Sequence, residues 1–347
     1  MKKPLFEKKN VIVAGGAGFI GAYLCNALVK DSFVICIDDL SGGSEKNIDH
    51  LLSLDNFRFI NHNLNEKLAL EEKKELEDLD LPFHGIQELY HLAALTSPNN
   101  FEKQKLEIYD TNIISTRNAL DLAVKYSSKF ILASSSVVYG KRHDNNTFFQ
   151  EDYFGYVDAI GPRACYDEGK RAAESLTSIY KEKYNLDARI ARIFRVYGPK
   201  MKLNDGHMLP DFVVNALEGK DLVIHGDENF ATSLCYVTDI VEAMMKMMDM
   251  DENAGPINIG SDQDYKLTYI ANRIIEIAKE FSPLAKNSKI KFGDSLLFMS
   301  SLGLPSIKKA KEKLGWIPIV TLEKGLRNMV DYVMANKNII EFRENSF

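Results

Sequence analysis

The chain has 347 residues, of which 45% are hydrophobic and 27% are charged, and its formal net charge is −6. This composition is typical of a globular protein, and it gives no basic footprint for nucleic acid. No apolar stretch approaches the ~20 residues of a membrane span, and the N-terminus lacks the apolar core of a signal peptide. We therefore expect a cytoplasmic protein that binds neither nucleic acid nor membrane. The cysteines, which are Cys25, Cys36, Cys165 and Cys235, show no metal-ligand spacing, so we expect no metal site.

The first predicted element is a strand at 11–14, which leads through a glycine-rich turn into a helix near 19–30. Gly15 permits the tight turn, Gly18 lets the backbone approach a pyrophosphate, and Gly21 allows the helix to pack closely on the strand. A pyrophosphate would then rest on the N-terminus of the helix, where backbone amides point outward. The pattern predicts that this segment binds a dinucleotide.

The second predicted strand, at 33–37, ends in an acid, Asp38. An acid at the end of this strand is placed to bind the ribose hydroxyls of NAD, and it would repel the additional phosphate of NADP. Asp39 is a competing acid at the next position, and the sequence leaves the choice between the two open.

The following elements continue to alternate between strands and helices. Strands are predicted at 57–60, 88–91, 130–133 and 189–194, and helices near 44–53, 102–126 and 165–184. The charged stretch 68–80 is predicted to be a solvated helix or an insertion. The alternation indicates an α/β fold with a Rossmann-type doubly wound parallel sheet and helices on both faces.

The character of the sequence changes after residue 199, where loops, short strands and helices mix. We expect residues 1–195 to form an NAD-binding Rossmann domain whose sheet is completed in part by later segments. Residues 196–347 are expected to form mainly a smaller C-terminal substrate-binding lobe. The crevice between the two, at the carboxyl ends of the strands, is the expected substrate site. Methionines on a helix that starts near Asp239 are expected to fill the core.

Tyr166 and Lys170 stand four residues apart on a predicted helix, so both side chains project from one face. A Lys ammonium beside a phenol favours the phenolate, because an opposite charge stabilises the ionised form. We therefore predict that Lys170 lowers the pKa of Tyr166. The phenolate could then take a proton from a sugar hydroxyl while a hydride leaves the same carbon.

With these motifs the chain resembles the extended short-chain dehydrogenase/reductase family, which modifies nucleotide sugars, and within it the UDP-glucuronate decarboxylases (UDP-xylose synthases). The most specific segment is IGPRACYDEGKR at 160–171, with further matches in YHLA at 90–93 and ARIF at 191–194. The resemblance covers nearly the whole chain, from Val11 to about Tyr332. It implies NAD as cofactor, a nucleotide-diphosphate sugar as substrate and oxidation of sugar carbon 4 to a 4-keto intermediate. It also implies a homodimer that forms a four-helix bundle from helices 102–126 and 165–184.

The resemblance implies roles for individual residues as well. A serine in the loop after the fifth strand would bridge the phenol and the sugar oxygen, so the predicted catalytic residues are Tyr166, Lys170 and Ser135. The predicted cofactor-binding residues are Gly15, Gly18, Phe19, Ile20, Gly21, Asp38, Asp39, Asn63, Leu64, Leu92, Ala93, Ala94, Asn112, Tyr166 and Lys170. The predicted substrate-binding residues are Ser135, Ser136, Tyr139, Arg195, Lys200 and His207.

Four positions depart from the decarboxylase pattern. Val137 replaces a Glu of the serine loop, so that SSSVVYG resembles the loop of an epimerase. Arg195 replaces the usual Asn, whereas Thr232 and Gly303 replace two arginines that neutralise the pyrophosphate or the carboxylate of the substrate. We hypothesise that Arg195 restores part of the lost charge, with the rest supplied by Lys200, Lys202 or His207.

Three functions are therefore weighed. The first is decarboxylation of UDP-glucuronate, which the similarity along the chain favours. The second is 4-epimerisation or 4-dehydrogenation of a hexose or heptose nucleotide, which Val137 and the missing arginines favour. The third is a non-catalytic NAD-binding sensor or scaffold, against which the presence of both Tyr166 and Lys170 argues.

Overall fold

The computed structural model describes residues 8–344 except 102, 143–147, 204 and 295–302. In these residues a seven-stranded sheet forms the centre of the larger part of the chain, in the order β12-β7-β5-β4-β1-β2-β3. Its strands are β1 (Lys9–Ala14), β2 (Ser32–Asp38), β3 (Phe57–Asn61), β4 (Glu88–His91), β5 (Lys129–Ser135), β7 (Ala188–Ile193) and β12 (Ile257–Ile259). Every neighbouring pair is parallel.

The strand order confirms the predicted doubly wound sheet. The chain proceeds outward from β1 to β3 and then returns to β4 on the other side of β1, so the order reverses between β1 and β4. Loops that leave these two strands at their carboxyl ends diverge, which opens a crevice for a ligand. Apolar, largely β-branched strands of this kind are buried on both faces, and all seven positions of β2 are buried.

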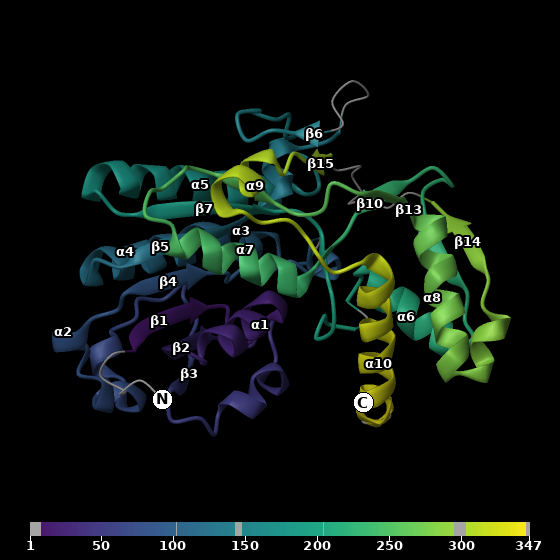
Figure 1. Ribbon diagram of the computed structural model, residues 1–347, viewed down its shortest axis with the longest axis horizontal. Helices are drawn as coiled ribbons and strands as arrows, with labels where there is room; N and C mark the ends of the chain where they lie inside the picture. Colours follow the sequence, from purple (N-terminus) through teal and green to yellow (C-terminus); the bar gives the residue numbers. More distant parts are fainter. Residues whose placement is uncertain (1–7, 102, 143–147, 204, 295–302, 345–347) are drawn as a thin grey trace.

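Helices cover both faces of the sheet (Figure 1). Val11 and Val13 of β1 belong to the core under α1 (Phe19–Leu28) and α7 (Val237–Asp249). Ile12 belongs to the core on the opposite face, which α4 (Thr116–Tyr126) and α5 (Ala164–Tyr184) cover. Met244 and Met247 of α7 are fully buried in the first core, so the prediction that the methionines fill the core is confirmed.

The smaller lobe lies beside the sheet and is largely helical (Figure 1). Its core is formed by three helices, α6 (Met208–Glu218), α8 (Leu267–Phe281) and α10 (Leu322–Glu344). Short strand pairs complete the smaller lobe. They are β9 (Leu222–His225) with β14 (Ile290–Gly293), β10 (Ala231–Ser233) with β13 (Asp264–Lys266), and β8 (Val196–Tyr197) with β11 (Cys235–Tyr236). The domain division at residue 195 stays a prediction, and both β12 and α7 pack in the sheet region from beyond it.

The remaining elements are short. They are α2 (Leu81–His84), α3 (Lys105–Asp110), α9 (Lys308–Leu314) and the parallel pair β6 (Phe148–Phe149) with β15 (Leu304–Pro305). Among the described helices, none combines the length and the apolar character that crossing a bilayer requires. The described residues likewise contain no group of three His, Cys, Asp or Glu side chains that could hold a metal ion.

Two predicted helices, at 44–53 and 102–126, were wrong in detail, and the 68–80 stretch, predicted as a solvated helix or an insertion, is not one continuous helix. Residues 44–53 form two short 3-10 turns, Glu45–Asn47 and Asp49–Leu51, and the 68–80 stretch forms two others, Leu70–Glu72 and Lys74–Leu79. Leu70 and Leu76 are buried although the stretch is charged, and each comes from a different one of these two turns. The helix predicted at 102–126 is interrupted by a π-helical turn at Thr111–Ser115.

Candidate functional site

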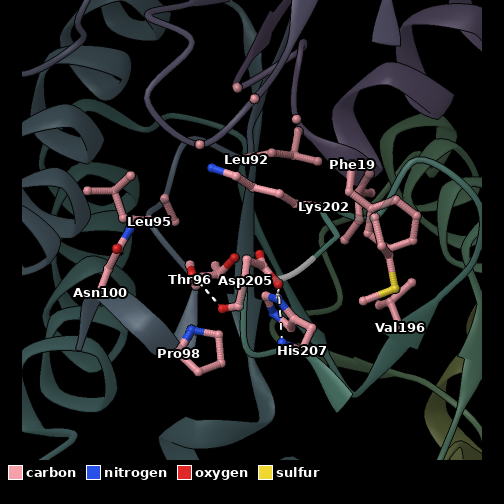
Figure 2. A pocket seen from close by; sticks show the side chains of 18 of the residues that line it. Phe19, Leu92, Leu95, Thr96, Pro98, Asn100, Val196, Lys202, Asp205 and His207 are labelled. Atoms are coloured by element: carbon pink, nitrogen blue, oxygen red, sulfur yellow. Dashed lines mark hydrogen bonds and ion pairs between the residues drawn. The ribbon is translucent and has the colours of Figure 1, made fainter. Parts of the chain in front are cut away.

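A cavity of about 1200 Å³ lies at the carboxyl edge of the sheet, between the sheet and the smaller lobe. Its lining comes from the glycine turn, from the loops that follow β2, β4 and β5, from the start of α5, and from segments 193–215 and 332–336 of the later half. Figure 2 shows part of it, with Leu92, Leu95 and Thr96 of the loop after β4 facing Lys202 and His207. The crevice predicted from the sequence is therefore present as a single large cavity.

The three motif glycines have different physical roles. Gly15 has φ +80°, and a Cβ there would lie 2.7 Å from the backbone nitrogen of Ala93, so both its conformation and its packing require glycine. A Cβ at Gly21 would collide with the carbonyl oxygen of Gly15, which fixes the close approach of α1 to the turn. A Cβ at Gly18 would meet nothing closer than 3.2 Å. The room above Gly18 therefore faces the cavity, as a pyrophosphate cradle requires.

The two acids at the end of β2 differ in how firmly they are held. Asp38 accepts hydrogen bonds from the amides of Ala17 (3.0 Å) and Leu40 (2.8 Å), which fix its carboxylate against the glycine turn. Burial raises the pKa of Asp38, and these amide hydrogen bonds oppose that shift. Asp39 instead accepts from the amide of Ser41 (2.9 Å) in an exposed turn. Both line the cavity, but the fixed carboxylate of Asp38 is the better ribose ligand.

Most of the other predicted cofactor residues also line the cavity, namely Phe19, Ile20, Asn63, Leu64, Leu92, Ala93 and Ala94. Asn112 does not line it. The Asn112 side chain is buried, donates a hydrogen bond to the carbonyl of Ile108 (2.8 Å) and packs against Gly169 of α5. The expectation that Asn112 contacts a ligand is corrected, because the π-helical turn directs this side chain into the packing between two helices.

The predicted catalytic residues meet at one wall of the cavity. Tyr166 and Lys170 come from the first turns of α5, and Ser135, at the end of β5, forms a hydrogen bond with the phenol of Tyr166. The ammonium of Lys170 donates to the carbonyl of Ala133 (2.9 Å), and its Nζ lies 5.9 Å from the centroid of the Tyr166 ring. All three side chains line the cavity, and we call the part that they form the catalytic wall.

The pKa shifts at this wall contradict the prediction that Lys170 lowers the pKa of Tyr166. Burial raises the pKa of Tyr166, and the hydrogen bond from Ser135 and the charge of Arg163 oppose the shift only in part. Lys170 does not produce the predicted decrease, because its ammonium is directed at the carbonyl of Ala133. Burial also lowers the pKa of Lys170 to about 8, while the negative charge of Glu174 opposes that change. The pair is thus more strongly desolvated than its spacing in the sequence indicated.

The predicted substrate residues are divided between two parts of the cavity. Ser136 and Arg195 lie near the catalytic wall, where burial and the neighbouring Arg163 lower the pKa of Arg195 to about 10. His207 lines the opposite part and its Nδ1 lies 2.7 Å from Oδ1 of Asp205, as Figure 2 shows. Lys200 donates to the carbonyl of Asn47 (2.6 Å), so it connects the smaller lobe to the segment after β2 on the dinucleotide side.

Tyr139 is the second predicted ligand-binding residue that lies outside the cavity lining. Its ring is fully buried, and its hydroxyl donates to Oδ1 of Asn258 (2.7 Å) and accepts from Nη1 of Arg192 (2.8 Å). The expectation of substrate contact is corrected, because the 3-10 turn Ser136–Tyr139 directs this side chain into a cluster of aromatic rings with Phe149 and Phe194.

The structure also explains three departures from the decarboxylase pattern. Val137 is buried, Thr232 is buried with its hydroxyl donating to the carbonyl of Ser233 (3.3 Å), and neither lines the cavity. At Gly303 a Cβ would lie 2.5 Å from the ring of Phe149, so a long side chain there would displace that ring. These three positions present no polar side chain to the ligand.

Several lining residues were missed by the sequence analysis. Arg163 stands three residues before Tyr166 in the IGPRACYDEGKR segment, and this proximity was the available signal. Tyr332 and Asn336 reach the cavity from α10, far beyond His207, the last predicted site residue in the chain, and no local pattern marks them. Asp205 lies beside the predicted His207 and could have been found as its partner.

Comparison with known proteins gives consistent matches along the chain. The sequence model of the NAD dependent epimerase/dehydratase family matches residues 11–260. UDP-glucuronic acid decarboxylase 1 of Xenopus tropicalis is 33% identical over 327 residues, which cover 94% of this chain and 72% of that protein. UDP-glucuronic acid decarboxylase 4 of Arabidopsis thaliana is 36% identical over 333 residues, which cover 95% of this chain and 70% of that protein.

Among solved structures, the UDP-glucuronic acid 4-epimerase from Bacillus cereus in complex with UDP-glucuronic acid and NAD is similar over 94% of this chain and 99% of that chain. Its sequence is 27% identical, and the TM-score is 0.81. The UDP-glucose 4-epimerase of Thermotoga maritima with UDP-glucose is 25% identical, over 95% of this chain and 99% of that chain, with a TM-score of 0.80.

The glycine turn generates a prediction about dinucleotide binding. Gly18→Ala should weaken NAD binding by about tenfold or more, because its methyl group would occupy the room that a pyrophosphate needs, while the carbonyl oxygen of Gly15, 3.2 Å away, would have to shift only slightly. Titration calorimetry with NAD and thermal unfolding measure the two effects. Gly21→Ala is the contrasting variant, because it should lower both stability and NAD affinity. Unchanged NAD affinity in Gly18→Ala would contradict the assignment of the cradle.

Proposed function

Since the chain belongs to the NAD dependent epimerase/dehydratase family, we propose that it oxidises carbon 4 of UDP-glucuronate to a 4-keto intermediate and then releases carbon dioxide. Membership of the family makes it an NAD-dependent enzyme of nucleotide-sugar metabolism. The observation that carries the proposal is the meeting of Tyr166, Ser135 and Lys170 at one wall of the cavity that the glycine turn also lines.

The residues present fit NAD. Gly18 would let the pyrophosphate approach the N-terminus of α1, and the fixed carboxylate of Asp38 would accept hydrogen bonds from a ribose. Lys170 would hold the second ribose, and Leu92 and Ala93 would lie against the dinucleotide. When bound, NAD supplies the hydride acceptor for the sugar carbon.

The catalytic wall then moves one proton. In the proposed oxidation, Tyr166 takes the proton of the hydroxyl on carbon 4, and Ser135 hydrogen-bonds both the phenol and the sugar oxygen. A phenol whose pKa is raised by burial needs a nearby cation in order to act as a base at neutral pH. Arg163 supplies part of this field. Lys170 would act in its protonated form by holding the ribose next to the nicotinamide.

The carbonyl formed at carbon 4 makes the uronate a β-keto acid. Its carboxyl group leaves as carbon dioxide, and the electron pair of the broken bond moves into the carbonyl to give an enolate. Ser135 and the protonated Tyr166 can stabilise the enolate oxygen by hydrogen bonds. Carbon 5 then regains a proton, and the overall reaction involves no net oxidation, since the bound cofactor would supply the reduction of carbon 4.

A 4-epimerase, acting on the same uronate or on a neutral sugar nucleotide, is the second candidate. It is favoured by Val137, which cannot transfer a proton in place of the acid of the decarboxylase loop, and by the similarity to the Bacillus cereus enzyme. Incubation with UDP-glucuronate separates the two, because a decarboxylase releases carbon dioxide whereas an epimerase retains the carboxylate. A 4-dehydrogenase would instead accumulate NADH and the keto sugar.

Arg195 is proposed as the residue that binds the anionic part of the substrate. It lines the cavity next to Arg163, and two neighbouring guanidinium groups in a desolvated site favour a negatively charged ligand. Arg163 also pairs with Asp167, at 3.2 Å. Arg195 thus supplies a cation to the site, whereas Thr232 and Gly303, which replace arginines of the family, do not.

A homodimer through a four-helix bundle is proposed from the surface of α3, α4 and α5. Large apolar side chains are exposed on these helices, including Leu106 (76% exposed) and Ile179 (54% exposed). Of the positions considered in the sequence, Ala119 and Leu120 are buried in the core, whereas Ile113 and Leu176 are only half-buried. An apolar surface of this kind is typical of an interface.

The first prediction from the proposed function concerns Tyr166. Tyr166→Phe should lower kcat by about 10³-fold or more, because the base is lost, while NAD affinity changes by less than about threefold. Turnover of UDP-glucuronate and NAD titration measure the two quantities. A non-catalytic NAD-binding sensor would show no turnover in either form and the same partner affinity in both, which would contradict the proposal.

The second concerns Arg195. Arg195→Ala should raise the KM for UDP-glucuronate by about tenfold or more, because a charged hydrogen bond of roughly 1.5–3 kcal/mol is lost. NAD affinity should be unchanged. Arg273→Ala, which removes a surface pair with Glu323, is the control and should leave KM unaltered. A change in KM of less than about twofold for Arg195→Ala would refute the assignment.

The third prediction from the proposed function concerns the formation of the homodimer. The double variant Leu106→Asp and Ile179→Asp should be monomeric in light scattering at concentrations at which the wild type is a dimer, because buried charges oppose association. Phe83→Asp changes an equally apolar residue, 82% exposed on α2, and should leave the dimer intact. A wild-type monomer, or a double variant that still dimerises, would refute the four-helix bundle.

A further inference from the structure

A carboxylate lies directly behind the catalytic wall. Glu174 follows Lys170 by four residues and Tyr166 by eight, so the three project from successive turns of one face of α5. Oε1 of Glu174 accepts a hydrogen bond from Oγ of Ser134 at 2.5 Å, and Oε2 accepts from Nη2 of Arg192 at 2.8 Å. Because Ser134 and Arg192 are paired neighbours on β5 and β7, Glu174 attaches α5 to two strands at once.

The same network fixes the far end of the serine loop. Nη1 of Arg192 donates to the hydroxyl of Tyr139 (2.8 Å) and to the carbonyl of Glu151 (2.9 Å). The Tyr139 hydroxyl in turn donates to Asn258 (2.7 Å). The segment from Ser134 to Tyr139 is therefore held at both ends by one arginine–glutamate pair, and Ser135 lies between the two points.

Glu174 also acts on the charge of Lys170. The ammonium of Lys170 is buried, which lowers its pKa to about 8, and the carboxylate of Glu174 opposes this decrease. The other charged or titratable groups around it are Tyr166 on its own helix, His91 on β4 and Arg192 on β7. Burial lowers the pKa of His91 to about 3, so His91 is neutral, and Arg192 is paired with Glu174.

We propose that Glu174 is a positioning residue of the catalytic wall: through Ser134 and Arg192 it sets the place of Ser135 beside Tyr166, and its charge stabilises the ammonium of Lys170. The proposal rests on the proposed function, in which Ser135 and the charged Lys170 act on the sugar. It gives Tyr139 and Arg192 a shared role as supports of the loop rather than as ligand contacts.

The test is the pH dependence of NADH binding, followed by fluorescence in the absence of any sugar. If the charged Lys170 holds the nicotinamide ribose, wild-type affinity should fall as pH rises through about 8. Glu174→Gln keeps the size and one acceptor of the side chain but removes its charge. The midpoint of the fall should therefore move to lower pH, by roughly one unit, because the buried ammonium loses its counter-charge. Glu182→Gln, on an exposed part of α5, should leave the midpoint in place.

The second variant is Ser134→Ala, which removes the hydrogen bond from Ser134 to Glu174 and retains the negative charge of Glu174. It should lower kcat several-fold at constant KM and leave the midpoint of NADH binding at its wild-type pH. A midpoint in Glu174→Gln within about 0.2 units of the wild type would overturn the electrostatic part. A kcat in Ser134→Ala within about twofold of the wild type would overturn the positional part, and this holds even if Glu174→Gln does not fold.

Failure of the proposed function is recognised separately. A wild-type protein that binds NADH with the expected pH dependence but turns over no sugar nucleotide would refute the assigned reaction. The shift of the midpoint in Glu174→Gln would still be measurable in that case, because the titration contains no sugar.

Discussion

Desolvation of the wall formed by Tyr166 and Lys170 is the constraint on which the site depends. Lys170 is buried and Tyr166 is half-buried where α5 begins, and desolvation raises the pKa of the phenol and lowers that of the ammonium. Each shift favours the neutral form, so the pair does not activate itself by being four residues apart. The hydrogen bond from Ser135 and the negative charge of Glu174 oppose these shifts. Ligands that bring positive charge to the wall would oppose the shift of the phenol further.

The fold supplies this wall and the dinucleotide cradle from the same edge of one sheet. The loops that follow β1 and β4 diverge at the reversal of strand order, β5 brings Ser135, and α5 brings Tyr166. The smaller lobe closes the opposite part of the cavity with Arg195, Lys200 and His207. Lys200 contacts the segment after β2, so cofactor and substrate halves are connected by a direct hydrogen bond. Oxidation at a sugar carbon needs both halves together, since hydride and proton leave the same atom.

The parts of the fold that the sequence could predict are those that local chemistry determines. The glycine turn was found because only glycine fits its φ and its approach to Ala93, and the strands were found because buried parallel strands are continuous apolar runs. Tyr166, Lys170 and Ser135 do lie together at the cavity, although their roles stay proposals. Asn112 and Tyr139 were assigned to ligands because their motif positions suggested it, but a π-helical turn and a 3-10 turn direct both side chains into the core.

The electrostatics of the site could not be predicted from spacing. Burial is a property of the whole tertiary structure, and Lys170 reaches the carbonyl of Ala133 only because α5 packs on β5. Tyr332 and Asn336 reach the cavity from a helix that no motif connects to it. The network of Glu174, Arg192 and Ser134 likewise joins three elements, α5, β7 and β5, and no local pattern marks it. Residues of this kind are found from contacts alone.

Hydride transfer between the sugar and bound NAD is measured most directly by rapid mixing of the protein with UDP-glucuronate. The absorbance of the reduced cofactor, NADH, is recorded over time. A transient rise is expected in the wild type, and deuterium at carbon 4 of the sugar should slow it. Product formation without any such rise in absorbance and without an effect of deuterium would contradict the assignment of carbon 4 as the atom oxidised.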